Sequence, residues 1–397
     1  MDSPRKAKIL FISQHFPHPP DADGARRICY NFLRCLASRY DITLLCYATP
    51  EDQVDSARLD CWCSRIVTVA SPRLTGMRKL LSLFSLQPSN VSVWYTRGMK
   101  AVLDELLSRN RFDLVYADML SMSRLLIGVS QPKIIAIHDA LSLLYKRRSA
   151  YRRGIPRMLL RWEEIRLRRW EHNALASTDG CCVVSDIDRD YLEQVGVPQV
   201  FTAVNGVDPP LITLETSVDP DTAVFSGVMD YPPNEDAALF FCREVMPLLK
   251  KRRPNAKFVV AGRNPTTRLL SCSSENVTVT GYVDDLAKVV ARGSVFVSPL
   301  RFGSGVKNKI LEAMAMGKAV VGSSLSFEGI EDLREAAIIA DDPLAFADSI
   351  ASLMERPPEA AKLGARAREL VLSRYSWEKT FSVVADRIDY LLRQRSP

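Results

Sequence analysis

The chain has 397 residues, of which 47% are hydrophobic and 25% charged, and its formal net charge is +7. These values are ordinary for a globular protein, and the length predicts two to three domains, each able to bury its own core. No run of about 18 apolar residues occurs and the N-terminus leads directly into an apolar strand, so we expect a cytoplasmic protein without a membrane-spanning helix or a signal peptide.

Short β-rich apolar runs alternate with amphipathic helical stretches along the whole chain. In the first half we predict strands at residues 7–13, 42–47, 66–69, 114–117, 134–137, 181–184 and 200–204. In the second half we predict them at residues 223–226, 258–261, 277–280, 295–298, 319–322 and 337–339. Continuous apolar strands separated by helices are typical of parallel sheets covered on both faces. Two such blocks predict an α/β protein with two Rossmann-like, doubly wound domains.

Prolines and acidic residues interrupt the periodicity between the two blocks, from Asn205-Gly-Val-Asp-Pro-Pro210 to Asp219-Pro-Asp221. Near the end of the chain, residues 377–394 carry apolar residues at helical spacing: Phe381, Val384, Ile388 and Leu391. We therefore predict an N-terminal domain over residues 1–206, a C-terminal domain over residues 207–375, and a final helix within residues 376–397.

Positive charge is concentrated in one segment. Residues 145–172 hold ten Lys or Arg against three acids, a net charge of +7 that equals that of the whole chain, with Trp162 and Trp170 among the arginines. A basic helix with aromatic residues fits the surface of an anionic membrane. A solvated outer helix whose apolar side packs on a sheet explains the same residues. No nucleic-acid-binding motif accompanies the segment, so nucleic acid is not an expected partner.

The nine cysteines and four histidines show no metal-ligand spacing, and Cys61-Trp-Cys63 is too short a spacing for a zinc site. We expect buried thiols in a reducing compartment, and no metal site.

The most informative segment runs from residue 301 to residue 321. An apolar strand leads into a glycine turn that includes Gly305, and the helix that follows carries Lys307, Lys309 and Glu312. A strand, a glycine turn and a helix N-terminus together favour a bound phosphate, because the backbone approaches closely and the helix dipole attracts negative charge. The two lysines would add positive charge, and Glu312 could accept hydrogen bonds from ribose hydroxyls. An ordinary βαβ unit explains the glycines as well.

This segment also resembles the C-terminal signature of retaining family 4 glycosyltransferases, whose usual form is a Glu, seven residues, then Glu-Ala-Met-Ala-x-Gly. The second Glu corresponds to Glu312, whereas the first falls on Ser304. The sequence is closer to a subgroup with Gly-x-Gly-x-[Lys/Arg]-x-Lys-x-Leu-Glu-Ala-Met-Ala, typical of bacterial exopolysaccharide sugar transferases, including those of PEP-CTERM systems. Asn205-Gly-Val-Asp208 and Tyr282-Val-Asp-Asp285 resemble the family's inter-domain linker and base-binding loop.

The resemblance implies the GT-B fold, in which two Rossmann-like domains face a cleft and the last helix crosses back onto the N-terminal domain. It also implies a nucleotide-diphosphate sugar as the donor. Glu312 would bind its ribose, Gly305 and Val306 would present amides to the phosphates, and Lys307 and Lys309 would neutralise them.

Further residues receive roles from the same resemblance. Gly24 would face the donor diphosphate, Tyr282 lies in the base-binding loop, and Ser304 lies where relatives bind donor-sugar hydroxyls. His138 follows a predicted strand, at the edge of the sheet where α/β proteins bind ligands, and would orient the sugar. A structural turn at Gly24 and a histidine hydrogen-bonded at a strand end are the alternative explanations of these two residues.

One feature departs from the family. Many members carry an Arg and a Lys near the start of the second domain that clamp the phosphates, and residues 226–234 contain neither. A diphosphate leaving group needs stabilisation by cations or N–H groups as its charge develops. Arg263, Arg301, Lys307 and Lys309 are the available substitutes.

The predicted function is transfer of a hexose, with retention of configuration, to a lipid-linked or polysaccharide acceptor, without a metal or other cofactor. The basic segment would attach the enzyme peripherally to the inner face of the plasma membrane. Two alternatives stay open: a nucleotide-sugar epimerase or phosphorylase of the same fold, and a non-catalytic nucleotide-sugar-binding or scaffold protein. A dinucleotide enzyme is not expected, because no Gly-x-Gly-x-x-Gly follows the first strand.

Overall fold

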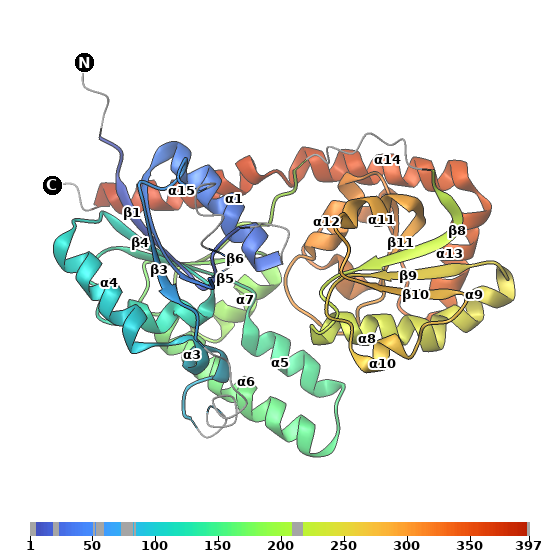
Figure 1. The fold of residues 1–397 in the computed structure, drawn as a ribbon, viewed down its shortest axis with the longest axis horizontal. Helices are drawn as coiled ribbons and strands as arrows, with labels where there is room; N and C mark the ends of the chain where they lie inside the picture. Colours follow the sequence, from blue (N-terminus) through green and yellow to red (C-terminus); the bar gives the residue numbers. More distant parts are fainter. Residues whose placement is uncertain are drawn as a thin grey trace. The chain divides into compact units, whose positions relative to one another are not determined.

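A computed structural model describes residues 5–18, 24–50, 52, 59–72, 82, 85–208 and 217–394. Its contacts divide the chain into two units, each with one parallel β-sheet. Unit 1 comprises the residues up to Val204 and those from Trp377 onward, and unit 2 comprises Asn205–Ser376 (Figure 1). All the strands predicted from the sequence are present, with ends that shift by a few residues. Among the described residues, no helix combines the length and apolar character needed to cross a bilayer.

Unit 1 has seven strands in the order β3-β2-β1-β4-β5-β6-β7, each parallel to its neighbours. Its strands are β1 Lys8–Ser13, β2 Asp41–Ala48, β3 Arg65–Ala70, β4 Leu114–Asp118, β5 Lys133–His138, β6 Gly180–Val183 and β7 Val200–Thr202. Its helices are α1 Gly24–Arg39, α3 Ser89–Trp94, α4 Arg97–Arg109, the 3₁₀ helix η3 Leu120–Leu126, α5 Leu141–Ala150, α6 Gly154–Leu175, α7 Asp186–Gln194 and α15 Trp377–Gln394.

Alternate residues of the same strands build two cores, one on each face of the unit 1 sheet. In β1, Leu10 and Ile12 join the cluster that includes residues of α4 and α6, whereas Ile9 and Phe11 join the cluster that includes residues of α1 and α15. Side chains of a strand point alternately to its two faces, so an uninterrupted apolar run fills both cores. This is why the strands read as continuous apolar stretches in the sequence.

The final helix α15 belongs to unit 1, although it follows unit 2 in the chain, and it lies beside α1 (Figure 1). Trp377 is buried there, with its ring centroid 6.3 Å from that of Phe32. The Tyr40 hydroxyl donates a 2.6 Å hydrogen bond to Asp389. The apolar stripe predicted for residues 377–394 is therefore the face that packs onto the N-terminal sheet, as the GT-B expectation requires.

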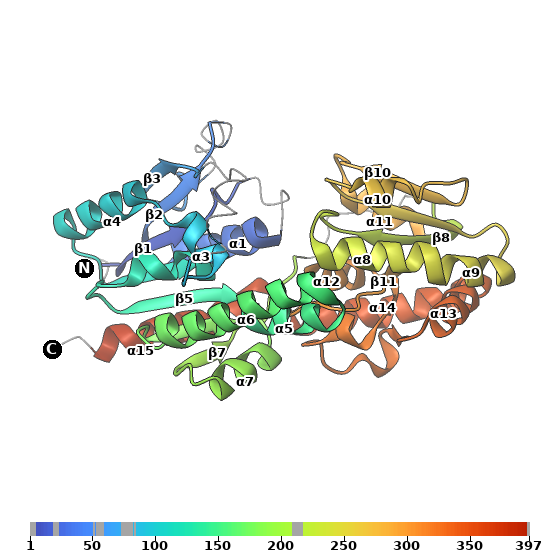
Figure 2. The same ribbon diagram turned by 90° about the horizontal axis from the view of Figure 1, so that it is seen from below.

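Unit 2 has six parallel strands in the order β10-β9-β8-β11-β12-β13. They are β8 Asp219–Ser226, β9 Lys257–Ala261, β10 Val277–Gly281, β11 Gly293–Ser298, β12 Ala319–Gly322 and β13 Ile338–Ile339. The helices are α8 Pro232–Phe240, the π-helix η4 Phe241–Val245, α9 Met246–Arg252, α10 Thr267–Leu270, α11 Leu286–Arg292, α12 Asn308–Ala315, the 3₁₀ helices η5 Ser324–Phe327 and η6 Leu333–Glu335, α13 Pro343–Glu355 and α14 Pro357–Arg374. Helices cover both faces of this sheet (Figures 1 and 2).

The cysteines are less uniformly buried than predicted. Five are buried, but Cys35, Cys242 and Cys272 are half-buried and Cys61 is exposed. Cys61 lies at the surface because it follows the turn at Leu59 rather than lying in a strand. All nine are free thiols.

Candidate functional site

In unit 1 the strand order reverses between β1 and β4, and the carboxyl ends of the strands at such a point are where open α/β sheets bind ligands. Polar residues collect there. Ser13 ends β1 and is followed by Gln14, Asp118 ends β4, and His138 ends β5. All four are buried. Burying polar side chains costs free energy, so their presence here suggests a role other than packing.

His138 and Asp118 form a hydrogen-bonded pair. His138 Nε2 lies 2.8 Å from Asp118 Oδ1. The backbone of His138 is left-handed, with φ at +62°, and the β5–β6 register shifts at this point. A histidine rarely adopts this conformation, and such strained positions cluster at functional sites. The predicted residue His138 is thus placed at the ligand edge of the sheet, and its partner Asp118 was missed, although it directly follows a predicted strand.

The charge of His138 is set by two opposing effects. Burial favours the neutral ring, but the Asp118 carboxylate and its hydrogen bond outweigh burial, so the pKa of His138 is raised above its usual value. Because the folded-state pKa is raised, the protonated ring stabilises the fold at low pH. That stabilisation is lost as the pH rises through the folded-state pKa.

We expect Asp118→Asn to lower the pKa of His138, because burial then acts without its opposing charge. The measurement is an NMR titration of the His138 ring in the full chain. Asp139→Asn is the matched control: Asp139 also raises this pKa, but less than Asp118 does, so the decrease should be smaller. An unchanged His138 pKa in Asp118→Asn would show that the pair does not set the charge.

Three polar residues at this edge were not singled out from the sequence: Gln14, His15 and Ser121. Ser121 Oγ donates a hydrogen bond to Gln14 Oε1, and Gln14 Nε2 lies 2.6 Å from His15 Nε2. Gln14 and His15 directly follow the first strand, which was the available signal. Gly24 is the exposed first residue of α1, and residues 19–23 of the loop predicted to face the diphosphate lie outside the described residues.

In unit 2 the strand order reverses between β8 and β11, and glycines crowd the carboxyl ends of β8 and β9. Gly227 N donates to Ala261 O, and Gly262 N donates to Gly281 O. A Cβ on Gly262 would lie 1.8 Å from the Gly227 carbonyl oxygen, and φ of Gly262 is +145°. Only glycine permits this approach. The backbones of these two turns therefore lie in close contact at this edge.

The predicted phosphate-binding turn lies after β11, and α12 begins at Asn308 with Lys307 as its N-cap. Gly305 has a left-handed backbone with φ at +67°. The first amides of a helix have no partner within the helix, so this end of α12 favours an anion. Glu312 lies just beyond the first helical turn and is half-buried.

Two polar side-chain atoms near this turn are buried and lack a hydrogen-bond partner within the described part of the chain. They are Ser304 Oγ and Asn205 Oδ1. Asn205 belongs to the linker motif and is held at the start of α12, because its Nδ2 donates a 2.8 Å hydrogen bond to Asn308 Oδ1. Buried polar atoms without partners are costly, and a bound polar ligand would satisfy them.

The two lysines of the motif differ in their surroundings. Lys307 Nζ donates to Gly305 O within the turn. Lys309 Nζ donates a 2.6 Å hydrogen bond to Asn234 Oδ1 and lies 4.3 Å from the centre of the Phe225 ring. Burial lowers the pKa of Lys309 to about 7, with the nearby Lys307 charge adding to the decrease and Glu312 opposing it.

Lys309 also reaches the segment where the family's phosphate clamp is absent. A Cβ on Gly227 would lie 2.8 Å from Lys309 Nζ and 2.7 Å from Asn234 Nδ2. The amine therefore sits against the turn that follows β8. A helix lysine thus places an amine beside residues 226–234, whose sequence contains no Lys or Arg.

Arg301 follows β11 and already has acidic partners within unit 2. Its guanidinium pairs with Asp236 of α8 through hydrogen bonds of 2.9 and 2.8 Å, and with Glu244 at 3.8 Å. Two carboxylates largely satisfy this cation, which leaves it less suited to phosphate than Lys309. Arg263 is half-buried after β9, and Tyr282 is 74% exposed after β10.

Within the ranges described, no group of three or more His, Cys, Asp or Glu side chains could hold a metal ion.

Comparisons with known proteins agree on the type of protein. Residues 22–210 match the sequence model of "Glycosyltransferase Family 4", and residues 220–356 match that of "Glycosyl transferases group 1". These two segments of the chain are thus similar to two families of glycosyltransferases.

Proteins similar to this chain include an "Uncharacterized 44.6 kDa protein in cps region" of Klebsiella pneumoniae, 23% identical over 41% of the chain and 44% of the relative. The phosphatidyl-myo-inositol mannosyltransferase of Mycolicibacterium smegmatis is 28% identical over 56% of the chain and 53% of the relative. The matches thus span about half the length of these relatives.

Solved structures share the fold over nearly the whole chain. Anabaena Alr3699/HepE in complex with UDP and glucose has a TM-score of 0.68 at 13% identity, covering 97% of this chain and 100% of that one. Sucrose-phosphate synthase from Thermosynechococcus elongatus has a TM-score of 0.69 at 15% identity, covering 98% and 100%. The predicted fold class, two Rossmann-like domains of the GT-B type with the last helix on the first domain, is confirmed.

Proposed function

We propose that this protein is a retaining glycosyltransferase that moves a hexose from a nucleotide-diphosphate sugar to a lipid-linked or polysaccharide acceptor. The N-terminal end of α12 is the observation that carries the proposal. It combines the first amides of the helix, two lysines, and the buried atoms Ser304 Oγ and Asn205 Oδ1, which lack partners within the described residues. A diphosphate with sugar hydroxyls supplies both the negative charge and the hydrogen bonds that this end of the helix requires.

In the proposed reaction the bond between the sugar C1 and the phosphate oxygen breaks, and the acceptor oxygen bonds to C1 on the same face. The acceptor proton passes to the departing phosphate oxygen, so no enzymic nucleophile and no metal is needed. Lys307, Lys309 and the amides of Gly305 and Val306 would stabilise the charge that develops on the phosphate. Glu312 would hold the ribose, and His138 would orient the sugar.

The relatives suggest which substrates to test first. One structural relative is described in complex with UDP and glucose, and one sequence relative is a mannosyltransferase that acts on phosphatidyl-myo-inositol. Another is described as lying in a cps region. UDP and GDP hexoses are therefore the first donors, and lipid-linked glycans and polysaccharides are the first acceptors.

The test is the thermal stabilisation of the purified chain by UDP, GDP, ADP and their sugars. A ligand at a hundredfold excess over Kd raises the free energy of unfolding by about 2.7 kcal/mol, so one base should give a clear shift. That donor is then incubated with acceptors, and the anomeric configuration of the product is determined by NMR. No shift with any nucleotide would overturn the proposal. Binding without turnover would favour a non-catalytic binding protein, and conversion of the sugar nucleotide alone would favour an epimerase.

A further inference from the structure

The N-terminal half of α6 carries a stripe of exposed apolar side chains. Their spacing of three, four, seven and ten residues places them on one side of the helix. Their exposed fractions run from 36% to 70%, and they are Ile155, Met158, Leu159, Trp162 and Ile165. The C-terminal half of the same helix is embedded in unit 1 through Leu167, Ala174 and Leu175, and α5 lies alongside it (Figure 2). The C-terminal half of the helix is thus buried in unit 1, and its N-terminal half has an exposed apolar surface.

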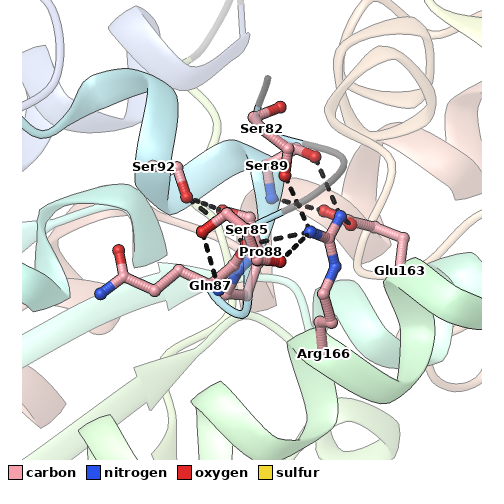
Figure 3. Close-up of polar contacts among 8 residues, drawn as sticks. All are labelled: Ser82, Ser85, Gln87, Pro88, Ser89, Ser92, Glu163 and Arg166. Carbon is pink, nitrogen blue, oxygen red and sulfur yellow. Dashed lines mark hydrogen bonds and ion pairs between the residues drawn. The ribbon is translucent and has the colours of Figure 1, made fainter. Parts of the chain in front are cut away.

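A buried arginine on α6 fixes the segment that precedes α3 (Figure 3). Arg166 Nη1 donates to the carbonyl oxygens of Ser82, Ser85 and Gln87 at 2.8, 2.6 and 3.2 Å. Its Nη2 pairs with Glu163 one helical turn earlier. Both side chains are less than 10% exposed. A buried charge needs such complete pairing, so removing either partner would be costly.

Arg166 and Glu163 together hold this segment, and we call the pair the α6 clamp. Glu163 contributes through its second carboxylate oxygen. Its Oε1 accepts a 2.7 Å hydrogen bond from the backbone N of Ser89, the first residue of α3. The effect is to hold both neighbours of Leu86, whose own side chain is 89% exposed. Arg166 Cζ lies 5.7 Å from the centre of the exposed Trp162 ring, so the clamp presents Leu86 close to the apolar stripe.

The exposed charged side chains of residues 145–172 are all positive. The three acids of residues 145–172, Glu163, Glu164 and Glu171, are 5%, 7% and 0% exposed. Glu163 pairs with Arg166, Glu164 pairs with Arg161, and Glu171 accepts hydrogen bonds from Ser142. Six basic residues of the segment are exposed instead, namely Lys146, Arg153, Arg157, Arg161, Arg168 and Arg169. The segment's acids therefore do not offset its basic surface.

We propose that this face of unit 1, formed by the α6 stripe, Leu86 and the surrounding arginines, binds the surface of an anionic lipid bilayer. Apolar side chains would enter the headgroup region, and the arginines would contact lipid phosphates, each cation adding about 1 kcal/mol. A second copy of the chain is a poorer occupant, since two such faces would repel each other. The inference goes beyond the proposed transfer reaction, because binding to lipid does not depend on the donor site.

The experiment measures co-sedimentation of the full chain with vesicles of phosphatidylcholine, with and without 30 mol% phosphatidylglycerol. We expect binding only to the anionic vesicles, and weaker binding as salt is raised. Brominated lipid should quench tryptophan fluorescence in the bound protein. Trp162→Phe should abolish most of that quenching while binding is retained. This result would show that Trp162 contacts the bilayer, with a substitution that is not expected to disturb the fold.

Matched variants separate the apolar and basic contributions. Arg157→Gln and Arg168→Gln should each weaken binding about fivefold. Met158→Ser with Leu159→Ser should weaken it at least tenfold, whereas Leu344→Ser, at a 52% exposed position on α13, should not change it. Failure to bind anionic vesicles, or equal binding by all variants, would overturn the proposal. So would concentration-dependent dimers that Met158→Ser abolishes, because a second copy would then cover the face. Nucleotide-induced stabilisation of the same preparations tests the transferase separately.

Discussion

Replacing Gly262 by alanine is expected to disrupt the edge of unit 2 that we propose binds the nucleotide sugar. The added Cβ would lie 1.8 Å from Gly227 O, which is a backbone atom that no side-chain movement can relieve. The φ of +145° adds strain for any residue with a Cβ. We expect a loss of more than about 4 kcal/mol of stability in unit 2, at the extreme end of single substitutions. Amide hydrogen exchange of β8 and β9 measures this loss of stability for unit 2 alone. The variant should also lose donor binding.

Gly303→Ala is the control for this substitution. Its Cβ would meet nothing closer than Lys307 Cε at 3.6 Å, which is an ordinary contact with a flexible side chain. This variant should keep the hydrogen-exchange protection of β8 and β9 close to that of the parent protein. If Gly262→Ala were equally well protected, the two turns would not be in the close approach that only glycine permits.

The sequence was sufficient to predict the sheets, because each strand is buried on both faces and therefore appears as an unbroken apolar run. The same logic located His138 and the turn before α12, since both directly follow such runs. The end of α15 was also predictable, because its apolar stripe has helical spacing that continues to the last turn.

Partners distant in the sequence could not be predicted in this way. Asn205 and Asn308 are 103 residues apart, and Lys309 and Asn234 are 75 apart. No periodicity connects them, because side-chain pairing depends on how separate βα loops meet at the edge of the sheet. The pairing of Arg301 with Asp236, 65 residues away, could not be predicted for the same reason. The hydrogen bonds from Arg166 to Ser82, Ser85 and Gln87 could not be predicted from the sequence pattern either.

Lys309→Met is expected to weaken donor binding by one to two orders of magnitude near pH 6.5, since a hydrogen bond to a charged group contributes about 1.5–3 kcal/mol. The parent protein should also show a pH dependence that the variant lacks. Because the pKa of Lys309 is lowered to about 7, the amine is neutral in the free protein above that pH, and binding the anionic donor must recharge it. Affinity should therefore fall as the pH rises above 7, by up to tenfold per unit. Titration calorimetry with a nucleotide sugar measures both effects, and the charge of that diphosphate ester is constant in this range.

Lys318→Met separates a specific role of Lys309 from the general cost of losing a buried amine. Burial also lowers the pKa of Lys318, to about 8, but its Nζ donates to Ala291 O at 2.9 Å, away from the glycine turn after β8. This variant should keep the donor affinity and its fall above pH 7. If Lys309→Met retained that same pH dependence, another group would carry the charge, and the amine lying against Gly227 would be a packing feature rather than the replacement for the missing phosphate clamp.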